Sequence, residues 1–119
     1  MNWGLIETLQ NWESEYQKEI DHALESRQAG NEGKARVCAR RAAGIIAAEY
    51  LKRRGIPATG YNAYELLQIL QNIPDLPPDV KEIASHFLLR LKPDHTFPIH
   101  SDLVGEARWL AAQLVEIKL

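Results

Sequence analysis

The chain has 119 residues and a mass of 13.5 kDa, the size of one domain built around one hydrophobic core. Hydrophobic residues make up 45% and charged residues 25%, which excludes general disorder. The net charge of −2 excludes a bulk positive charge for non-specific nucleic-acid binding. A single cysteine, Cys38, excludes an internal disulfide and a zinc site built on thiolates. We therefore expect residues 1–119 to form a single domain.

The sequence has neither the pattern of a membrane span nor that of an export signal. Its longest uncharged stretch, Gly55 to Tyr64, contains Pro57 and is too short to cross a bilayer. The first residues reach Glu7 without the charged and then apolar layout of a signal peptide. We expect a cytoplasmic protein without a membrane partner.

Apolar spacing predicts a long first helix that ends in a glycine-containing turn. Steps of three and four residues place one apolar stripe on this helix, formed by Ile6, Leu9, Trp12, Tyr16, Ile20, Ala23 and Leu24. Gly30, Asn31 and Gly33 then end the helix and form the turn.

A second helix is predicted from Glu32 to Arg54. Its centre, residues 42–48, is apolar on nearly every side and rich in small side chains, which predicts a place in the middle of a bundle. Gly44 costs about 1 kcal/mol relative to alanine in a helix interior, so we expect another element to pack closely against it. Cys38, one turn into this helix, is expected to be a small buried hydrophobe.

Three shorter helices are predicted in the second half of the chain. Asn62 and Glu65 have the spacing of a capping box, ahead of a helix that ends before Pro74. The next helix opens at Pro77-Pro78 and is expected to continue until Pro93. Ser101 is expected to cap the last helix, whose buried side is Leu103, Ala107, Leu110, Leu114 and Ile117. The predicted fold class is all-α, a compact antiparallel bundle of about five helices with a four-helix core.

The charges are distributed unevenly along these helices. Residues 1–32 have a net charge of −5, residues 33–54 of +6 and residues 55–119 of −3. One interpretation is that an acidic helix lies beside a basic one and that their exposed side chains pair. The other is that the basic segment forms a patch that binds phosphates.

One pair of residues is a candidate for catalysis. The sequence has no phosphate-binding glycine loop, and its histidines lack the spacing of metal ligands, so we expect no metal and no cofactor. Arg90, near the end of a helix, and His95, in the following loop, can reach one cleft. A neutral imidazole can accept the proton of a ribose 2′-hydroxyl, and a guanidinium can hold the phosphate. Alternatively, Arg90 bonds the last carbonyl groups of its own helix and His95 is an ordinary loop residue.

The order of the elements and the sequence from Lys34 to Leu114 resemble the HEPN superfamily of helical domains. The matching parts are the alanine-rich residues 35–43, Tyr50-Leu51 with Gly55, residues 62–67, Arg90 with Pro93-Asp94, and Glu106-Ala107. In that family a histidine four to six residues after the arginine completes the signature, and His95 falls in that window.

The resemblance implies an all-α homodimer in which two Arg/His pairs face a shared cleft. Many members are metal-independent ribonucleases of toxin–antitoxin or other defence systems, which would make Arg90 and His95 catalytic. Other members are inactive and bind nucleotides or partner proteins, often beside a small nucleotidyltransferase. Two functions therefore stay open: an RNA- or nucleotide-binding bundle with endoribonuclease activity, or a non-catalytic dimeric module that docks with a nucleotidyltransferase antitoxin or another protein.

Four further residues are candidates for contacts with ligands or partners. Arg36 and Arg40 lie four residues apart on one helical face, and together with Lys92 they are candidates for phosphate contacts. Alternatively, the two arginines pair with acidic residues of the first helix. Trp109 lies off the apolar stripe of the last helix, which suits a partner or dimer surface or packing at the edge of the core. In a third possibility the bundle is purely structural.

Overall fold

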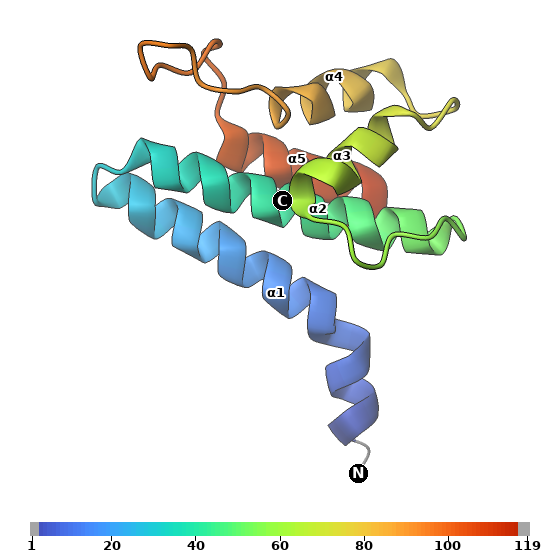
Figure 1. The fold of residues 1–119 in the computed structure, drawn as a ribbon. Coiled ribbons are helices and arrows are strands. Elements are labelled where there is room, and N and C mark those ends of the chain that lie inside the picture. Colours follow the sequence, from blue (N-terminus) through green and yellow to red (C-terminus); the bar gives the residue numbers. More distant parts are fainter. Residues whose placement is uncertain (1–2, 117–119) are drawn as a thin grey trace.

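The structure is a computed structural model that describes the backbone of residues 3–116 and the side chains of residues 11–116. It contains five helices, shown in Figure 1: α1 (Trp3–Gln28), α2 (Glu32–Arg53), α3 (Ala63–Gln71), α4 (Pro78–His86) and α5 (Leu103–Val115). The described residues contain no strand, so the predicted all-α bundle is confirmed. Within this part of the chain, no helix combines the length and the apolar character that crossing a membrane requires.

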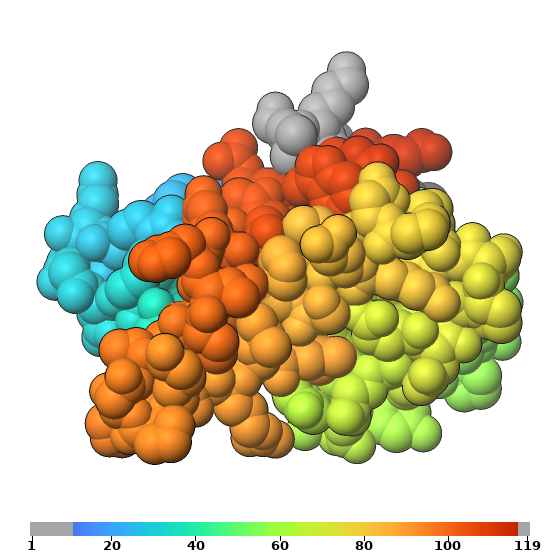
Figure 2. Space-filling model, turned by 90° about the horizontal axis from the view of Figure 1, so that it is seen from above, coloured from blue at the N-terminus to red at the C-terminus, as the bar shows by residue number. Residues whose placement is uncertain are grey.

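Helix α2 lies at the centre of the bundle, as its small side chains predict. It contacts α1, α3 and α5, while α4 packs on α3 and α5. Figure 2 shows the face formed by α3, α4 and the loop of residues 87–102, which joins α4 to α5. The buried positions of α2 are mostly alanines, so neighbouring helices approach its backbone on several sides.

The closest of these approaches is at Gly44. A Cβ atom on this residue would lie 2.6 Å from the Cβ of Ala63 and 2.8 Å from its Cα, closer than carbon atoms can pack. The first residue of α3 therefore rests directly on the backbone of α2. This contact confirms the expected close packing, and it fixes where α3 begins.

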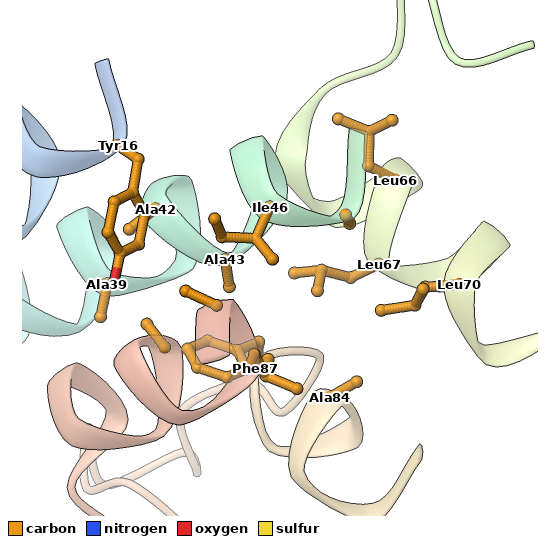
Figure 3. Packing of buried hydrophobic residues seen from close by; sticks show 14 of the residues in the cluster. Tyr16, Ala39, Ala42, Ala43, Ile46, Leu66, Leu67, Leu70, Ala84 and Phe87 are labelled. Atoms are coloured by element: carbon orange, nitrogen blue, oxygen red, sulfur yellow. The ribbon is translucent and has the colours of Figure 1, made fainter. Parts of the chain in front are cut away.

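One hydrophobic core joins the five helices (Figure 3). Phe87, just after α4, is fully buried against α2 and α5, and Cys38 is buried as predicted. In the stripe of α1, Tyr16, Ile20 and Ala23 are buried and Trp12 packs at the edge of the core.

Parts of two predicted stripes are not confirmed. Leu24 is 40% exposed, so its assignment to the buried stripe of α1 was wrong. In the last helix Leu103, Ala107 and Leu110 are buried and Leu114 is partly buried. The side chains of the remaining stripe residues lie outside the described part: Ile6, Leu9 and Ile117.

The predicted starts of the middle helices are confirmed. Asn31 caps α2 by accepting a hydrogen bond from the Lys34 amide, after a turn in which Gly30 has φ of +79°. At α3 the capping box is complete: the Glu65 amide donates to Asn62 at 2.8 Å, and the Asn62 amide donates to the Glu65 carboxylate at 3.2 Å. Pro78 opens α4.

Two predicted helix ends were wrong. Helix α4 ends at His86, well before Pro93. The Phe87 carbonyl accepts a hydrogen bond from Arg40 Nε at 2.9 Å, and this bond takes the place of one from a backbone amide in a further turn of helix. The N-cap of α5 is Asp102 rather than Ser101. The Asp102 carboxylate accepts from the amide of residue 105 and also binds Arg27, a second partner that favours it as the cap.

Candidate nucleic-acid interface

The 87–102 loop carries three of the predicted site residues, Arg90, Lys92 and His95, and all three side chains are exposed. Backbone hydrogen bonds close residues 92–96 into a turn: the Lys92 amide donates to the Thr96 carbonyl at 2.9 Å, and the His95 amide donates to the Lys92 carbonyl at 2.8 Å. Figure 2 shows the loop, in orange, as a lobe beside the first turns of α2. These hydrogen bonds give the loop a defined shape.

Asp94 stabilises the turn that presents His95. Its carboxylate accepts hydrogen bonds from the Thr96 hydroxyl and amide, at 2.6 and 3.1 Å, and these bonds lower the pKa of Asp94. His95 itself has φ of +67°, in the left-handed region that few residues other than glycine adopt. The backbone therefore holds an exposed imidazole at the tip of an ordered turn.

Arg90 lies in this loop and not at a helix end, which corrects the sequence prediction. Its guanidinium lies over the ring of Tyr64 in α3, 5.0 Å from the ring centre. Among the described residues it makes no hydrogen bond to carbonyl groups of α4, so the alternative of a helix-capping arginine was wrong. The cation–π contact with Tyr64 holds Arg90 on the side of the loop that faces α3.

Arg40 lies near Arg90 and is partly buried. It projects from α2, and its Nε hydrogen bond to the Phe87 carbonyl fixes the direction of the guanidinium. Burial, and after it the charge of Arg90, lower the pKa of Arg40. The charges of the two guanidinium groups therefore repel each other.

Arg36 extends the same face by one turn of α2. Its guanidinium lies over the ring of Phe97, 5.1 Å from the ring centre, so the loop is attached to α2 through both of these arginines. We call Arg36, Arg40 and Arg90, with the rings of Tyr64 and Phe97, the arginine–aromatic face.

No carboxylate neutralises the arginine–aromatic face within residues 11–116. The arginines that do form ion pairs in this range are Arg27, Arg53 and Arg54. The prediction that acidic residues of α1 pair with basic residues of α2 was wrong for the described side chains. The ion pair that joins these two helices has its basic residue, Arg27, on α1 and its acidic residue, Glu32, on α2. The three arginines of the face are therefore available for an anion.

The structure unites some predicted site residues and leaves others apart. Arg36, Arg40 and Arg90 share one face, whereas no hydrogen bond joins Arg90 to His95 in the described part of the chain. The exposed side chain of Lys92 stands in the same loop, and Trp109 is partly buried against the core.

Sequence reasoning did not assign Tyr64 and Phe97 to this face. They lie far from their arginine partners along the chain, and no local spacing signals such contacts. The Nδ1 atom of His86 lies 2.9 Å from the Glu106 carboxylate, a contact that joins α4 to α5. Within the described residues, no three His, Cys, Asp or Glu side chains form a cluster suited to a metal ion.

A scan against protein-family models found no match, and searches of the curated proteins and of the solved structures found none either. The class of protein is therefore defined by the fold and the site alone: a small all-helical domain with an ordered arginine–aromatic face that no carboxylate of residues 11–116 neutralises.

Proposed function

We propose that the arginine–aromatic face binds single-stranded RNA or a nucleotide through its phosphate groups. One observation carries the proposal: Arg40, which is partly buried, lies near enough to Arg90 for their charges to repel, and neither has a carboxylate partner among the described residues. Such an arrangement costs free energy in the empty protein, and a bound phosphate relieves it by forming charge-assisted hydrogen bonds to both groups.

The aromatic residues of the face favour a ligand that also contains bases. The exposed guanidinium of Arg90 lies over the ring of Tyr64, and a guanidinium group can also stack on a flat base. Recognition of unstacked bases on arginine planes and aromatic rings is typical of single-stranded RNA binding. Arg36 over Phe97 repeats the motif one helical turn away, and Lys92 supplies a further exposed cation.

Cleavage of the bound RNA is the catalytic form of this proposal. The neutral imidazole of His95 accepts the proton of a ribose 2′-hydroxyl, and the 2′-oxygen attacks the phosphorus. The 5′-oxygen of the next nucleotide leaves and takes up a proton, which gives a 2′,3′-cyclic phosphate and a 5′-hydroxyl. Arg90 stabilises the charge that develops on the phosphate oxygens. The resemblance of residues 34–114 to HEPN domains supports this chemistry. The same resemblance supports a homodimer that acts in a toxin–antitoxin system with a nucleotidyltransferase partner.

The test measures binding and cleavage of a fluorescein-labelled single-stranded RNA in the presence of EDTA. We expect Arg40→Gln and Arg90→Gln each to weaken binding about tenfold, the effect of removing a charge-assisted hydrogen bond. Arg53→Gln is the matched control, because it removes the same charge from the same helix about 20 Å further along it. His95→Ala is expected to abolish cleavage and to leave binding within about twofold of wild type.

Three results would contradict the proposal or its catalytic form. Equal binding by wild type and the Arg40 and Arg90 variants would refute the binding face. Cleavage that survives His95→Ala, or binding with no cleavage by wild type, would refute the catalytic form and leave a non-catalytic nucleotide-binding module.

A further inference from the structure

A hydrogen bond joins the two helix ends between which the 87–102 loop runs. The loop begins after His86, the last residue of α4, and ends before Leu103, the first residue of α5 (Figure 1). His86 Nδ1 lies 2.9 Å from Oε1 and 3.0 Å from Oε2 of Glu106, in the first turn of α5. The contact therefore links the start of the loop to its end.

The His86–Glu106 pair is largely shielded from water. The two side chains are 20% and 18% exposed, and neither forms another ion pair within residues 11–116. An ionised carboxylate only accepts hydrogen bonds, so the imidazole donates from Nδ1. Hydrogen bonds to an ionised group are among the strongest polar contacts in proteins, which makes this pair a durable link at the base of the loop.

Other contacts of the loop use the arginines that the proposed function assigns to phosphate. Arg40 donates to the first carbonyl of the loop, Arg36 lies over an aromatic ring of the loop, and Arg90 connects the loop to α3. A bound phosphate draws on the same guanidinium groups. The His86–Glu106 pair uses none of them, so it can hold the loop while the arginines bind a ligand.

We propose that His86 and Glu106 form a clamp that positions the 87–102 loop, and with it Arg90, for the binding of RNA phosphates. Both are positioning residues, because they act through the loop and are assigned no contact with the ligand. The inference rests on the proposed function for its effect on RNA binding. The clamp itself is a property of the folded loop, and its effect on the loop is measured without RNA.

The charge of Glu106 gives the proposal a distinctive sign. If electrostatics alone decided, removing a negative charge would strengthen the binding of an anionic ligand. Loss of the clamp has the opposite effect, because Arg90 is no longer held over Tyr64. We therefore expect Glu106→Leu to weaken the binding of a fluorescein-labelled single-stranded RNA about fivefold, although it makes the protein more positive.

Conservative variants separate the hydrogen bond from the packing of the two side chains. His86→Leu removes the donor, His86→Asn keeps an N–H group near the position of Nδ1, and Glu106→Gln keeps an accepting oxygen. We expect His86→Leu to weaken RNA binding as Glu106→Leu does, and the Asn and Gln variants to bind within about twofold of wild type. The double variant His86→Leu/Glu106→Leu should lose no more than either single variant, because all three lack the same bond.

Two aromatic rings report the position of the loop in the absence of RNA. The guanidinium of Arg90 lies 5.0 Å from the centre of the Tyr64 ring, and that of Arg36 lies 5.1 Å from the centre of the Phe97 ring. The ring currents shift the Nε–H signals of these arginines in a ¹H–¹⁵N spectrum. Both signals should move toward the position of free arginine in the leucine variants and stay in place in the Asn and Gln variants.

One control variant and one wild-type measurement complete the test. Asp75→Ala breaks an ion pair with Arg54 at the other end of α2, so it controls for an unspecific loss of stability and should move neither arginine signal. In wild type, at a pH where the His86 ring is neutral, ¹⁵N spectra of the imidazole should place its proton on Nδ1, as the contact with Glu106 requires. This measurement needs no variant, so it tests the clamp even where a leucine variant does not fold.

The proposal is overturned if both arginine signals stay in place in folded leucine variants, or if Glu106→Leu binds RNA more tightly than wild type. It is equally overturned if the Asn and Gln variants lose as much binding as the leucine variants, or if the neutral His86 ring carries its proton on Nε2. A wild-type protein that binds no RNA, with arginine signals that move in the leucine variants, would refute the proposed function and leave the clamp in place.

Discussion

Replacing Gly44 with alanine adds one methyl group at the closest contact between two helices. In an ordinary helix interior this change stabilises a protein by about 1 kcal/mol, because alanine is the better helix former. Here the new Cβ would lie 2.6 Å from the Cβ of Ala63 and 2.8 Å from its Cα, which belongs to the backbone of α3. No flexible side chain is there to move aside, so the start of α3 must shift by about 1 Å to restore van der Waals contact.

The overlap outweighs the gain in helix propensity. Overpacking of this kind costs typically 1–3 kcal/mol, and a clash with backbone belongs at the upper end of that range. After the gain of about 1 kcal/mol is subtracted, we expect Gly44→Ala to lower the free energy of unfolding by about 1–2 kcal/mol. For a domain of this size the melting temperature should fall by about 4–8 °C. Because Tyr64 follows Ala63 directly, RNA binding through Arg90 should weaken as well.

Gly33→Ala is the matched control for this measurement. Gly33 lies in the first turn of α2, and its added Cβ would meet only side-chain atoms at 3.8 and 3.9 Å, which is ordinary contact. This control should be as stable as wild type or slightly more stable, and the double variant Gly44→Ala/Ala63→Gly should recover part of the loss. Urea or thermal unfolding followed by circular dichroism measures all four proteins. A Gly44→Ala protein at least as stable as wild type would refute the reasoning.

Three further substitutions test separate parts of the structure. Tyr64→Ala should weaken RNA binding severalfold in an anisotropy titration, while Tyr64→Phe, which keeps the ring under Arg90, should bind like wild type. Asn62→Ala removes the N-cap of α3 and should cost about 1 kcal/mol in urea unfolding; no change would argue against the capping box. Partial burial opposes ionisation of Asp102, but hydrogen bonds from the Gly105 amide and from Arg27 hold its pKa below the ordinary value of 3.8. The ionised Asp102 therefore stabilises the fold above pH 3.8, and this contribution is lost as the pH falls through the lowered pKa. In a plot of the free energy of unfolding against pH, Arg27→Ala should therefore reduce the loss of stability at acid pH. An unchanged pH dependence would contradict the role given to Arg27.

Local patterns predict most of this fold because helices and their caps are encoded by neighbouring residues. Asn62 and Glu65 lie three residues apart, and their spacing alone identifies the start of α3. Gly44 is a similar case, since an otherwise unfavourable glycine in a run of small residues indicates a close approach. The identity of the approaching element, Ala63, is not contained in that pattern.

The end of α4 and the arginine–aromatic face depend on contacts between distant parts of the chain. The apolar stripe continues past His86, but the hydrogen bond from Arg40 to the Phe87 carbonyl joins residues 47 positions apart and replaces the next turn of helix. Arg90 and Tyr64 likewise meet only after α3 and α4 have packed. The sequence identified the three arginines as candidates, and tertiary packing decides that they share one face.

The salt dependence of RNA binding tests the central claim most directly. Each phosphate that a protein neutralises on a single-stranded ligand adds about 0.7 to the magnitude of the negative slope of log K against log salt. Three phosphates neutralised by Arg36, Arg40 and Arg90 predict a slope of about −2 for wild type, and Arg40→Gln should reduce its magnitude by about 0.7. The Arg53→Gln control should keep the wild-type slope. A wild-type slope near zero, or equal slopes for wild type and Arg40→Gln, would contradict the assignment of this face to phosphate binding.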